Sequence, residues 1–411
     1  MTVVATSKKR PVVNVTSRHT RHTMWWDDPL PDAGAFDAQC ASVGGRVHAG
    51  KSATTGGGRA LFATAHAAKG EIIFRESPAL ILQDAGNRPG ARACARCHST
   101  LRGAPNETVC ARGCGEGYCD ERCAVAHVHE GSHSLMCVGP LDSWEHPLAA
   151  LKLACARDDD GDGHLACIAE MCARCIASAA RRAGGVDASV SSSGDASVPS
   201  SGDASSVSGS SVSAALDDVN LRGFVAGPVW DWPGQSGGDE SRAKCEVYAG
   251  MIRDAMASHE PSGALRGADA LMDSESGVVS ARGVAELAGA LVRNYLTVVV
   301  ESAPESAPES APGDASVSSH DAPTRYEGVG LFPLTCLMNH SCEPNVEVHF
   351  QDAGPGVGVV SVAHALRAIE PGEELRHSYV DSDRPVFLRA ADLASFGFRC
   401  DCVRCARARG V

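Results

Sequence analysis

The chain has 411 residues, 44% of them hydrophobic, which is enough for two or three domains with buried cores. Its formal net charge is -13 and its isoelectric point is about 5.6, so no overall basic field draws it to nucleic acid or to an acidic membrane surface. No apolar stretch approaches the roughly 18 residues of a transmembrane helix. We therefore expect no strong nucleic-acid binding and no membrane span.

The first 26 residues contain no acidic side chain and carry five basic ones, Lys8, Lys9, Arg10, Arg18 and Arg21. Organelle transit peptides share this composition, so a transit peptide is one interpretation. The sequence favours the plainer one, a disordered basic tail over residues 1–45.

Residues 46–93 are typical of strands and turns. The stretch 54–59, Thr-Thr-Gly-Gly-Gly-Arg, opens the region, and apolar segments follow at 60–65 and 69–78. Glycine lets the backbone approach a ligand closely, although most glycine triplets are only turns. No Lys-Ser or Lys-Thr follows this triplet, so it is not a phosphate-binding P-loop.

Residues 94–137 contain eight candidate metal ligands in four closely spaced pairs: Cys94 and Cys97, Cys110 and Cys114, Cys119 and Cys123, His133 and Cys137. Four such ligands close a tetrahedral structural zinc site, with sulfur about 2.3 Å from the metal. A segment this short and glycine-rich cannot bury a core of its own. Metal binding would therefore supply much of its folding energy.

The chain has eighteen cysteines, many in short-spaced clusters, and its sequence shows no secretory signal pattern. This usage favours metal binding in a reducing compartment, so we expect a cytoplasmic and/or nuclear protein. An oxidised disulfide framework is the alternative.

Between residues 165 and 179 apolar side chains recur at helical spacing, which predicts a helix from about 164 to 181. Cys172 and Cys175 lie on this stripe, and we interpret them as core rather than as a metal or redox pair. The segment 158–163 begins like an EF-hand loop. Its closing carboxylate position is Ala169, so we exclude calcium there.

Two low-complexity tracts interrupt the chain. Residues 186–213 are almost entirely Ser, Gly, Ala, Val and Asp, and residues 301–312 repeat Glu-Ser-Ala-Pro three times. Neither has the hydrophobicity to offset the entropy of ordering. We expect disordered segments over 184–215 and 301–322.

A polar stretch at 339–345, Asn-His-Ser-Cys-Glu-Pro-Asn, separates the apolar run 330–338 from the alternating run 346–350. The flanking runs predict a buried segment and a half-exposed strand. The Asn and His side chains offer donors and acceptors that a polar cofactor could use, and Pro344 makes the local path stiff.

This stretch resembles the Asn-His-Ser-Cys-x-Pro-Asn signature of SET-domain lysine methyltransferases. Residues 372–379, Gly-Glu-Glu-Leu-Arg-His-Ser-Tyr, resemble the SET motif Gly-Glu-Glu-Leu-x-x-x-Tyr. Residues 58–61 and 70–73 resemble Gly-Arg-Gly-Leu and Gly-Glu-x-Ile of the SET-and-MYND family, with Ala60 in place of the second glycine. Residues 294–298 resemble the family's Asn-x-Phe-x-Ile strand, and alone they would be an ordinary buried strand within 285–300.

Residues 118–123 and the final His-x3-Cys resemble a MYND zinc finger, in which the ligand pairs interleave. The resemblance implies one ion on Cys94, Cys97, Cys119 and Cys123, and another on Cys110, Cys114, His133 and Cys137. The gap before His133 is longer than usual in the family, so His127 or His129 could replace His133 as a ligand.

Residues 396–405 resemble a post-SET zinc loop, whose thiolates Cys400, Cys402 and Cys405 are one short of a tetrahedral set. In the family the fourth comes from the Asn-His-Ser-Cys signature, which is Cys342 here. The resemblance therefore implies three zinc ions per chain.

The resemblance implies an α+β fold with a β-rich SET core, split by a MYND finger and a helical insert and followed by a post-SET zinc loop. The expected parts are the tail 1–45, the SET halves 46–93 and 285–381, the finger 94–137, the insert 138–284, and the post-SET segment 382–411.

The activity implied is transfer of a methyl group from S-adenosylmethionine to a lysine of a protein, histone or otherwise. Tyr379 matches the family's catalytic tyrosine, and the cofactor contacts match Gly58, Arg59, Asn294, Asn339, His340 and Phe398. Phe396 stands where relatives usually have a tyrosine that lines the lysine channel. Such a displacement needs a deprotonated amine in a dry, narrow channel.

The alternative is a catalytically weak adaptor, whose MYND finger binds peptide motifs of partner proteins in transcriptional regulation. The presence of Tyr379, Asn339 and His340 argues against decayed catalysis, whereas Ala60 and Phe396 leave room for it. We expect a monomer.

Overall fold

The computed structural model describes residues 33–53, 58–129, 132–139, 143, 145–156, 163–183, 228–231, 238–259, 265, 268–275, 277–301, 325–394 and 396–410. The tail residues 1–32, the glycine-rich residues 54–57, the tract 184–215 and residues 302–322 lie outside the described residues.

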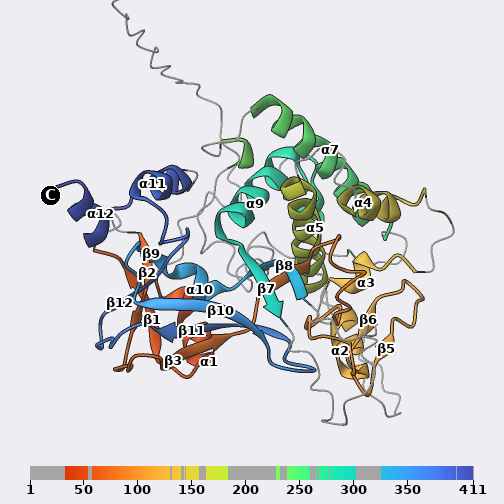
Figure 1. Cartoon of the computed structure of the whole chain (residues 1–411). Helices are drawn as coiled ribbons and strands as arrows, with labels where there is room; N and C mark the ends of the chain where they lie inside the picture. The colour runs from red at the N-terminus through yellow and green to blue at the C-terminus, as the bar shows by residue number, and fades with distance from the viewer. Residues whose placement is uncertain are drawn as a thin grey trace, which may run out of the picture.

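Short strands form the core in several small sheets (Figure 1). One sheet has the order β1-β2-β12-β9, from Val47–Lys51, Arg59–Ala63, Glu374–His377 and Asn339–His340. A second, β10-β11-β3, consists of Val346–Asp352, Val359–Ala365 and Ile72–Glu76, and a third, β4-β8-β7, of Leu80–Gln83, Arg325–Leu331 and Leu296–Glu301. A small pair, β5-β6, joins Thr108–Val109 to Gly117–Tyr118. Strands from the two ends of the chain therefore share sheets.

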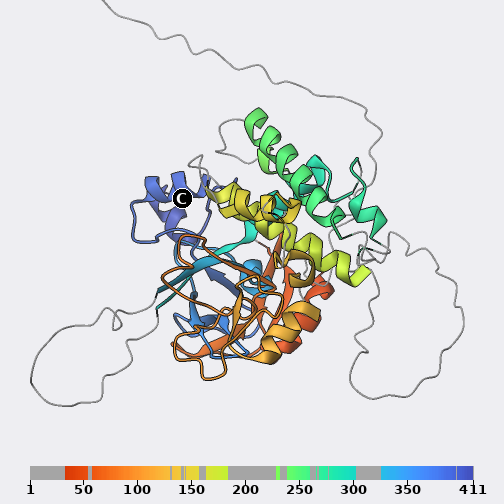
Figure 2. The same cartoon turned by 90° about the vertical axis from the view of Figure 1, so that its right-hand side faces the viewer.

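The longer helices pack together beside these sheets (Figures 1 and 2). They are α4 (Pro147–Ala156), α5 (Gly163–Ala183), α7 (Gly238–Ala257) and α9 (Ala281–Asn294). Helix α5 confirms the helix predicted from the apolar spacing. Cys172 and Cys175 are buried in the shared helical core, as expected for packing residues.

Shorter helices complete the molecule: η1 (Ala33–Phe36), α1 (Asp37–Ser42), α2 (Glu121–His129), α3 (His133–Met136), η3 (Val229–Asp231), α8 (Asp269–Met272), α10 (Pro333–Leu337), α11 (Val386–Ala394) and α12 (Val403–Ala408). Within the described part of the chain, no helix is long and apolar enough to cross a membrane. The mixture of helices and small sheets confirms the α+β class.

The structure corrects three expectations. The tail was predicted to reach residue 45, but η1 and α1 are ordered, because Phe36 and Cys40 lie four residues apart and pack into the same core as β1. Residues 285–294 belong to helix α9, whose N-cap Ser280 accepts a hydrogen bond from the Gly283 N–H, so the strand begins only at β7. Glu301, assigned to a disordered segment, is the last residue of β7.

The finger, residues 94–137, is anchored to the second sheet. The N–H of Val359 in β11 donates to the Cys97 carbonyl at 3.0 Å, and the Ser99 hydroxyl donates to Asp352 of β10 at 3.0 Å. Gly358 lies between these contacts with a φ of +78°, and a Cβ added to it would fall 1.7 Å from the Cys97 carbonyl oxygen. This glycine lets the backbones of the finger and the sheet meet.

Replacing Gly358 by Ala should therefore destabilise the protein by about 2 kcal/mol or more, because both the positive φ and the backbone collision oppose a methyl group. Urea unfolding measures the loss. Gly356→Ala is the matched control, since its φ is +83° and nothing lies within 4 Å of the added Cβ. Equal losses in the two variants would mean that only the backbone conformation matters, and not the contact with the finger.

Candidate functional site

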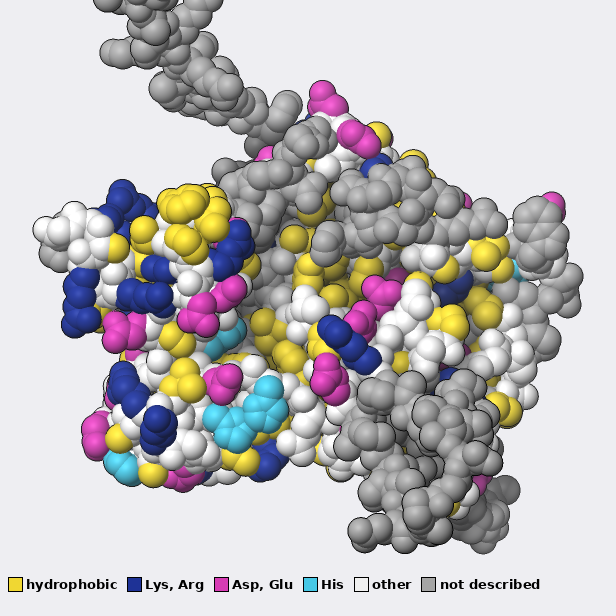
Figure 3. All heavy atoms as spheres, in the orientation of Figure 1, with side chains coloured by type: hydrophobic (Ala, Val, Ile, Leu, Met, Phe, Trp, Pro, Cys, Tyr) yellow, Lys and Arg dark blue, Asp and Glu magenta, His cyan; other side chains and the backbone are white. Residues whose placement is uncertain are grey.

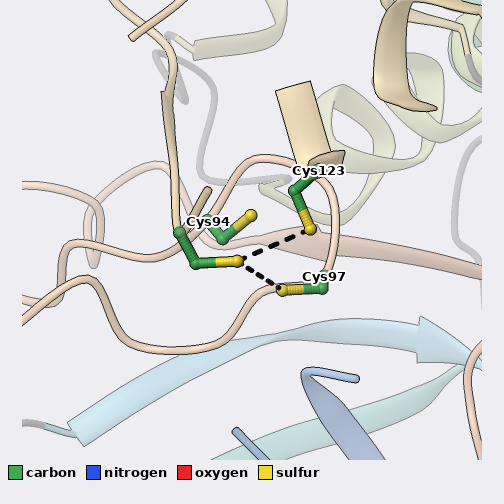
Figure 4. Close-up of side chains that lie close together, drawn as sticks. Cys94, Cys97 and Cys123 are labelled. Atoms are coloured by element: carbon green, nitrogen blue, oxygen red, sulfur yellow. Dashed lines mark hydrogen bonds between the residues drawn. The ribbon is translucent and has the colours of Figure 1, made fainter. Parts of the chain in front are cut away.

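Three groups of four possible metal ligands lie in the described part of the chain, and within each group all ligand atoms are within 4.8 Å of one another. The first is Cys94, Cys97, Cys119 and Cys123. Figure 4 shows Cys94, Cys97 and Cys123 turned toward one another. The Cys119 sulfur lies 3.8 Å from that of Cys97 and 3.5 Å from that of Cys123. Sulfurs on a tetrahedral zinc would lie about 3.8 Å apart, so the donor set fits that metal.

The second group is Cys110, Cys114, His133 and Cys137. The Nε2 atom of His133 lies 3.3 Å from the Cys110 sulfur and 3.7 Å from the Cys114 sulfur. Burial lowers the pKa of His133 to about 4, so its ring is neutral, which is the form that ligates metal. His127 instead meets the Tyr118 hydroxyl through Nδ1 at 3.3 Å. The geometry thus groups His133, rather than His127 or His129, with the cysteines.

The third group joins Cys342, from the polar stretch, to Cys400, Cys402 and Cys405 near the C-terminus. The Cys342 sulfur lies 3.5 Å from that of Cys405 and 4.0 Å from that of Cys400. Arg389 of α11 is buried beside the group, and its Nη2 atom lies 3.9 Å from the Cys405 sulfur. Four thiolates on a divalent ion leave two negative charges, which this guanidinium partly offsets.

The sulfur spacing in all three groups contradicts the disulfide alternative. A disulfide bond is about 2.05 Å long, whereas all eighteen cysteines are free thiols.

The C-terminal segment carries an arginine-rich surface in a chain of net negative charge. Figure 3 shows Lys and Arg side chains gathered over α11 and α12. Besides the buried Arg389, this segment carries five arginines: Arg384, Arg399, Arg404, Arg407 and Arg409. Any attraction for an acidic partner would therefore be local to this surface.

Strand β9 holds the polar stretch parallel to β12, with Asn339 opposite Arg376 and His340 opposite His377. The side chain of Asn345 extends this pairing. Its Nδ2 donates to the Glu374 carbonyl at 2.9 Å, and its Oδ1 accepts from the Arg376 N–H at 2.8 Å. Asn345 was not singled out from the sequence, and it fixes the end of the stretch.

Tyr379 follows β12 and lies in a cluster of rings, which we call the aromatic cluster. Its centroid is 5.4 Å from that of His340, 5.0 Å from His377, 5.4 Å from Phe396 and 6.3 Å from Phe398. The Tyr379 hydroxyl donates to the Met338 carbonyl at 2.8 Å. Burial raises the pKa of Tyr379 well above its usual value, so the phenol keeps its proton.

His340 connects the aromatic cluster to the third cysteine group. Its Nδ1 accepts the Tyr379 backbone N–H at 3.0 Å, so Nε2 carries the ring proton and directs it at the Cys342 sulfur, 3.2 Å away. Burial lowers the pKa of His340 to about 4, consistent with one ring proton. Both ring nitrogens are thus engaged within the protein.

The other residues expected to contact a cofactor divide into two sets. Arg59, which follows Gly58 at the start of β2, has a buried Nη1 atom without a partner among the described residues, and it therefore fits a ligand with an anionic group. The Asn339 side chain donates to the Arg59 carbonyl at 3.0 Å. Phe398 is 39% exposed and offers one ring face.

Asn294, in contrast, ends helix α9, and its amide donates to the Ala290 carbonyl at 2.7 Å. Its own carbonyl accepts from the Cys336 thiol of α10 at 2.8 Å. These contacts link Asn294 to the helix that precedes the polar stretch.

Sequence reasoning missed two buried polar residues here. His377 is the last residue of β12, two residues before Tyr379, and this close spacing in the sequence could have indicated its place. Glu76 of β3 accepts hydrogen bonds from the N–H groups of Leu334 and Thr335 at 2.7 and 2.9 Å, so it caps α10. No local pattern pointed to Glu76.

The fold and the site together agree with the sequence comparisons. The SET-domain family model matches residues 58–380, which is most of the chain, and the protein belongs to the SET-domain family.

Individual relatives match a shorter part of it. A SET and MYND domain-containing protein of Dictyostelium discoideum is 35% identical over 79 residues, which are 19% of this chain and 22% of that protein. The mouse histone-lysine N-methyltransferase SMYD3 is 42% identical over 79 residues, 19% of this chain and 17% of the relative. The zebrafish N-lysine methyltransferase SMYD2-A is 40% identical over 86 residues, 21% and 18% of the two chains. The chain thus spans about a fifth of the length of these relatives.

Glu76 makes stability depend on pH. Burial raises its pKa to about 7, although its hydrogen bonds from Leu334 and Thr335 oppose the shift. As pH rises, the Glu76 carboxyl therefore loses its proton at a lower pH in the unfolded state than in the folded state. The free energy of unfolding falls between the unfolded pKa near 4.5 and the folded pKa of about 7. From pH 6 to pH 8 the free energy of unfolding should fall by about 1 kcal/mol more in the parent than in Glu76→Gln, measured by urea unfolding. An identical pH dependence in both proteins would contradict the raised pKa.

The ligand groups predict three zinc ions per chain, measured by elemental analysis of purified protein. Cys342→Ser should lower the content by one ion and also weaken cofactor binding, because His340 ties Cys342 to the aromatic cluster. Cys245→Ser is the control, since this buried cysteine belongs to the helical core and to none of the groups. One zinc or none in the parent would rule out the two-site finger.

Proposed function

We propose that this protein is an S-adenosylmethionine-dependent lysine N-methyltransferase that acts on a protein substrate. The observation that carries the proposal is the aromatic cluster: Tyr379 with its hydroxyl fixed, beside the polar stretch that runs parallel to β12. The match to the SET-domain model over residues 58–380 and the printed activities of the mouse and zebrafish relatives support it.

S-adenosylmethionine, when bound, supplies a methyl group on a positively charged sulfur that an amine nitrogen can displace. The unpartnered Nη1 atom of Arg59 suits the anionic carboxylate of that molecule, and the exposed ring of Phe398 suits its flat base. The residues present therefore fit this cofactor.

The chain contributes positioning and exclusion of water. The rings of His340, His377, Phe396 and Phe398 contact the Tyr379 ring and cover part of it from water. Because the Tyr379 proton is held by the Met338 carbonyl, the lone pairs of the phenol oxygen remain available to polarised C–H or N–H groups. A neutral amine held there by the phenol oxygen would be restricted in how it turns, which an in-line displacement requires.

The three metal ions would be structural in this proposal. Each group has four protein ligands, which leaves no open position for a substrate. All eighteen cysteines are free, in keeping with a reducing compartment, and we propose a cytoplasmic and/or nuclear location.

We also propose that the finger binds a peptide of a partner protein. A groove of about 980 Å³ lies on it, beside the exposed side chains of Val109 and Val125. Two acidic residues of the lining, Glu107 and Asp120, are ion-paired with arginines, so the proposal rests on the exposed valines, which an apolar peptide segment complements. A purely adaptor role is not favoured, because it gives no reason for the ordered aromatic cluster around Tyr379. Calorimetry with S-adenosylmethionine separates the two roles.

Tyr379→Phe tests the enzymatic proposal. The hydroxyl acts in the transition state, so the transfer rate should fall by about 100-fold or more while cofactor affinity changes little. Transfer from radiolabelled S-adenosylmethionine to core histones and to a cell lysate measures the rate, and calorimetry measures the affinity. Tyr326→Phe is the control, because this buried phenol contacts His98 of the finger at 2.9 Å. Transfer by Tyr379→Phe at the parent's rate would overturn the assignment.

A further inference from the structure

His377 is a buried histidine that contacts Tyr379 in the aromatic cluster. It lies in β12 opposite His340, its ring centroid is 5.0 Å from that of Tyr379, and only 8% of its surface is exposed. Burial, and to a smaller extent the charge of His340, lowers the pKa of His377 to about 4. The ring is therefore neutral at physiological pH, with one N–H and one lone pair.

The hydrogen bonds of the cluster are otherwise complete. Tyr379 donates its proton to the Met338 carbonyl, and both ring nitrogens of His340 are engaged. The described residues supply neither ring nitrogen of His377 with a hydrogen-bond partner. Neither nitrogen is among the fully buried polar atoms that lack a partner in the described residues, so the ring, although mostly buried, keeps a nitrogen that a ligand beside Tyr379 can reach.

The neighbouring rings indicate which kind of ligand this is. Phe396 and Phe398 both contact the Tyr379 ring and add hydrocarbon to the cluster, and Phe396 has no hydroxyl with which to hold a polar group. Besides the Tyr379 oxygen, the neutral imidazole of His377 is thus a second group of the cluster that can accept a proton donor. An alkyl amine has the required shape, because its chain suits the phenyl rings and its N–H groups suit the nitrogen.

We propose that His377 accepts a hydrogen bond from the substrate amine and so orients the nitrogen lone pair for methyl transfer. The proposal rests on the proposed function and deepens it. The covalent step is unchanged: the amine forms an N–C bond, the sulfonium loses its S–C bond and becomes a thioether, and the new ammonium later releases its proton to water. His377 forms no bond in this step, and it restricts how the amine turns.

The arrangement makes the effect depend on the methylation state. An unmodified lysine amine has two N–H groups, a monomethylated one has a single N–H, and a dimethylated one has none. His377 can therefore assist the first and second transfers and cannot assist a third. A residue that merely supported the fold would affect all transfers equally.

The first test replaces His377 by Leu, which keeps the bulk and removes the nitrogens. With core histones as the probe and mass spectrometry of successive products, the first two transfers should slow by about tenfold, the worth of one hydrogen bond. Any third transfer, started from dimethylated histone, should keep the parent's rate. Equal slowing of every step, or no slowing, would overturn the proposal.

A rescue experiment sharpens the result. The rings of Phe396 and His377 both contact that of Tyr379, so Phe396→Tyr adds a hydroxyl to the aromatic cluster. In the His377→Leu background, Phe396→Tyr should raise the transfer rate several-fold. In the parent the same substitution should raise it less. The effects of the two substitutions on the rate are then not additive, as expected for residues that share one ligand. His349→Leu is the control, because this histidine stacks on His364 on another sheet, 4.5 Å between centroids.

The second test does not depend on methyl transfer. In protein labelled with 15N-histidine, the His377 ring signals are identified by their loss in His377→Leu. Addition of n-butylammonium with S-adenosylhomocysteine should shift these signals, whereas n-butyltrimethylammonium, with the same charge and no N–H, should not.

No shift, or equal shifts with both cations, would overturn the role of His377. A selective shift in a parent protein that transfers no methyl group to histones or lysate would instead overturn the proposed function and leave the amine site standing.

Discussion

The parallel pairing of β9 with β12 is the constraint on which the candidate site depends. A two-residue strand makes too few backbone hydrogen bonds to hold itself in place. The side chains of Asn339 and Asn345 supply the missing bonds, to the Arg59 carbonyl on one side and to the backbone of Glu374 and Arg376 on the other. One short segment therefore fixes the neighbours of Tyr379 and delivers Cys342 to the third cysteine group.

This pairing also explains why the histidines of the site are neutral. His340 and His377 lie opposite each other, and burial lowers the pKa of each to about 4. A charged ring beside a sulfonium would repel it, whereas neutral rings can give or accept a hydrogen bond without that cost. Arg389, a buried permanent cation, faces the thiolates of the third group. Positive charge is thus placed where negative charge accumulates.

The sequence predicted those features that short-range chemistry determines. Cysteine spacing and the family resemblance gave the membership of the ligand groups, and apolar spacing gave α5, because both patterns act over a few residues. It did not predict α9, although Val284, Leu287, Ala288 and Leu291 recur at helical spacing, and it began the following strand at Asn294, which is the last residue of α9. Residues 33–45 and Glu76 could not be placed, since their partners lie on distant segments. The same holds for Arg389, which contacts thiolates brought from elsewhere in the chain.

The third cysteine group has a consequence for the order in which the protein matures. Cys342 must wait for Cys400, Cys402 and Cys405, which leave the ribosome roughly sixty residues later, at about 5–20 residues per second. The finger, by contrast, has all its ligands by residue 137. A nascent chain can thus load its first two metal sites while the aromatic cluster is still incomplete. Tyr379 acquires its full set of neighbours only after translation has passed Phe398, so the site is among the last parts of the molecule to form.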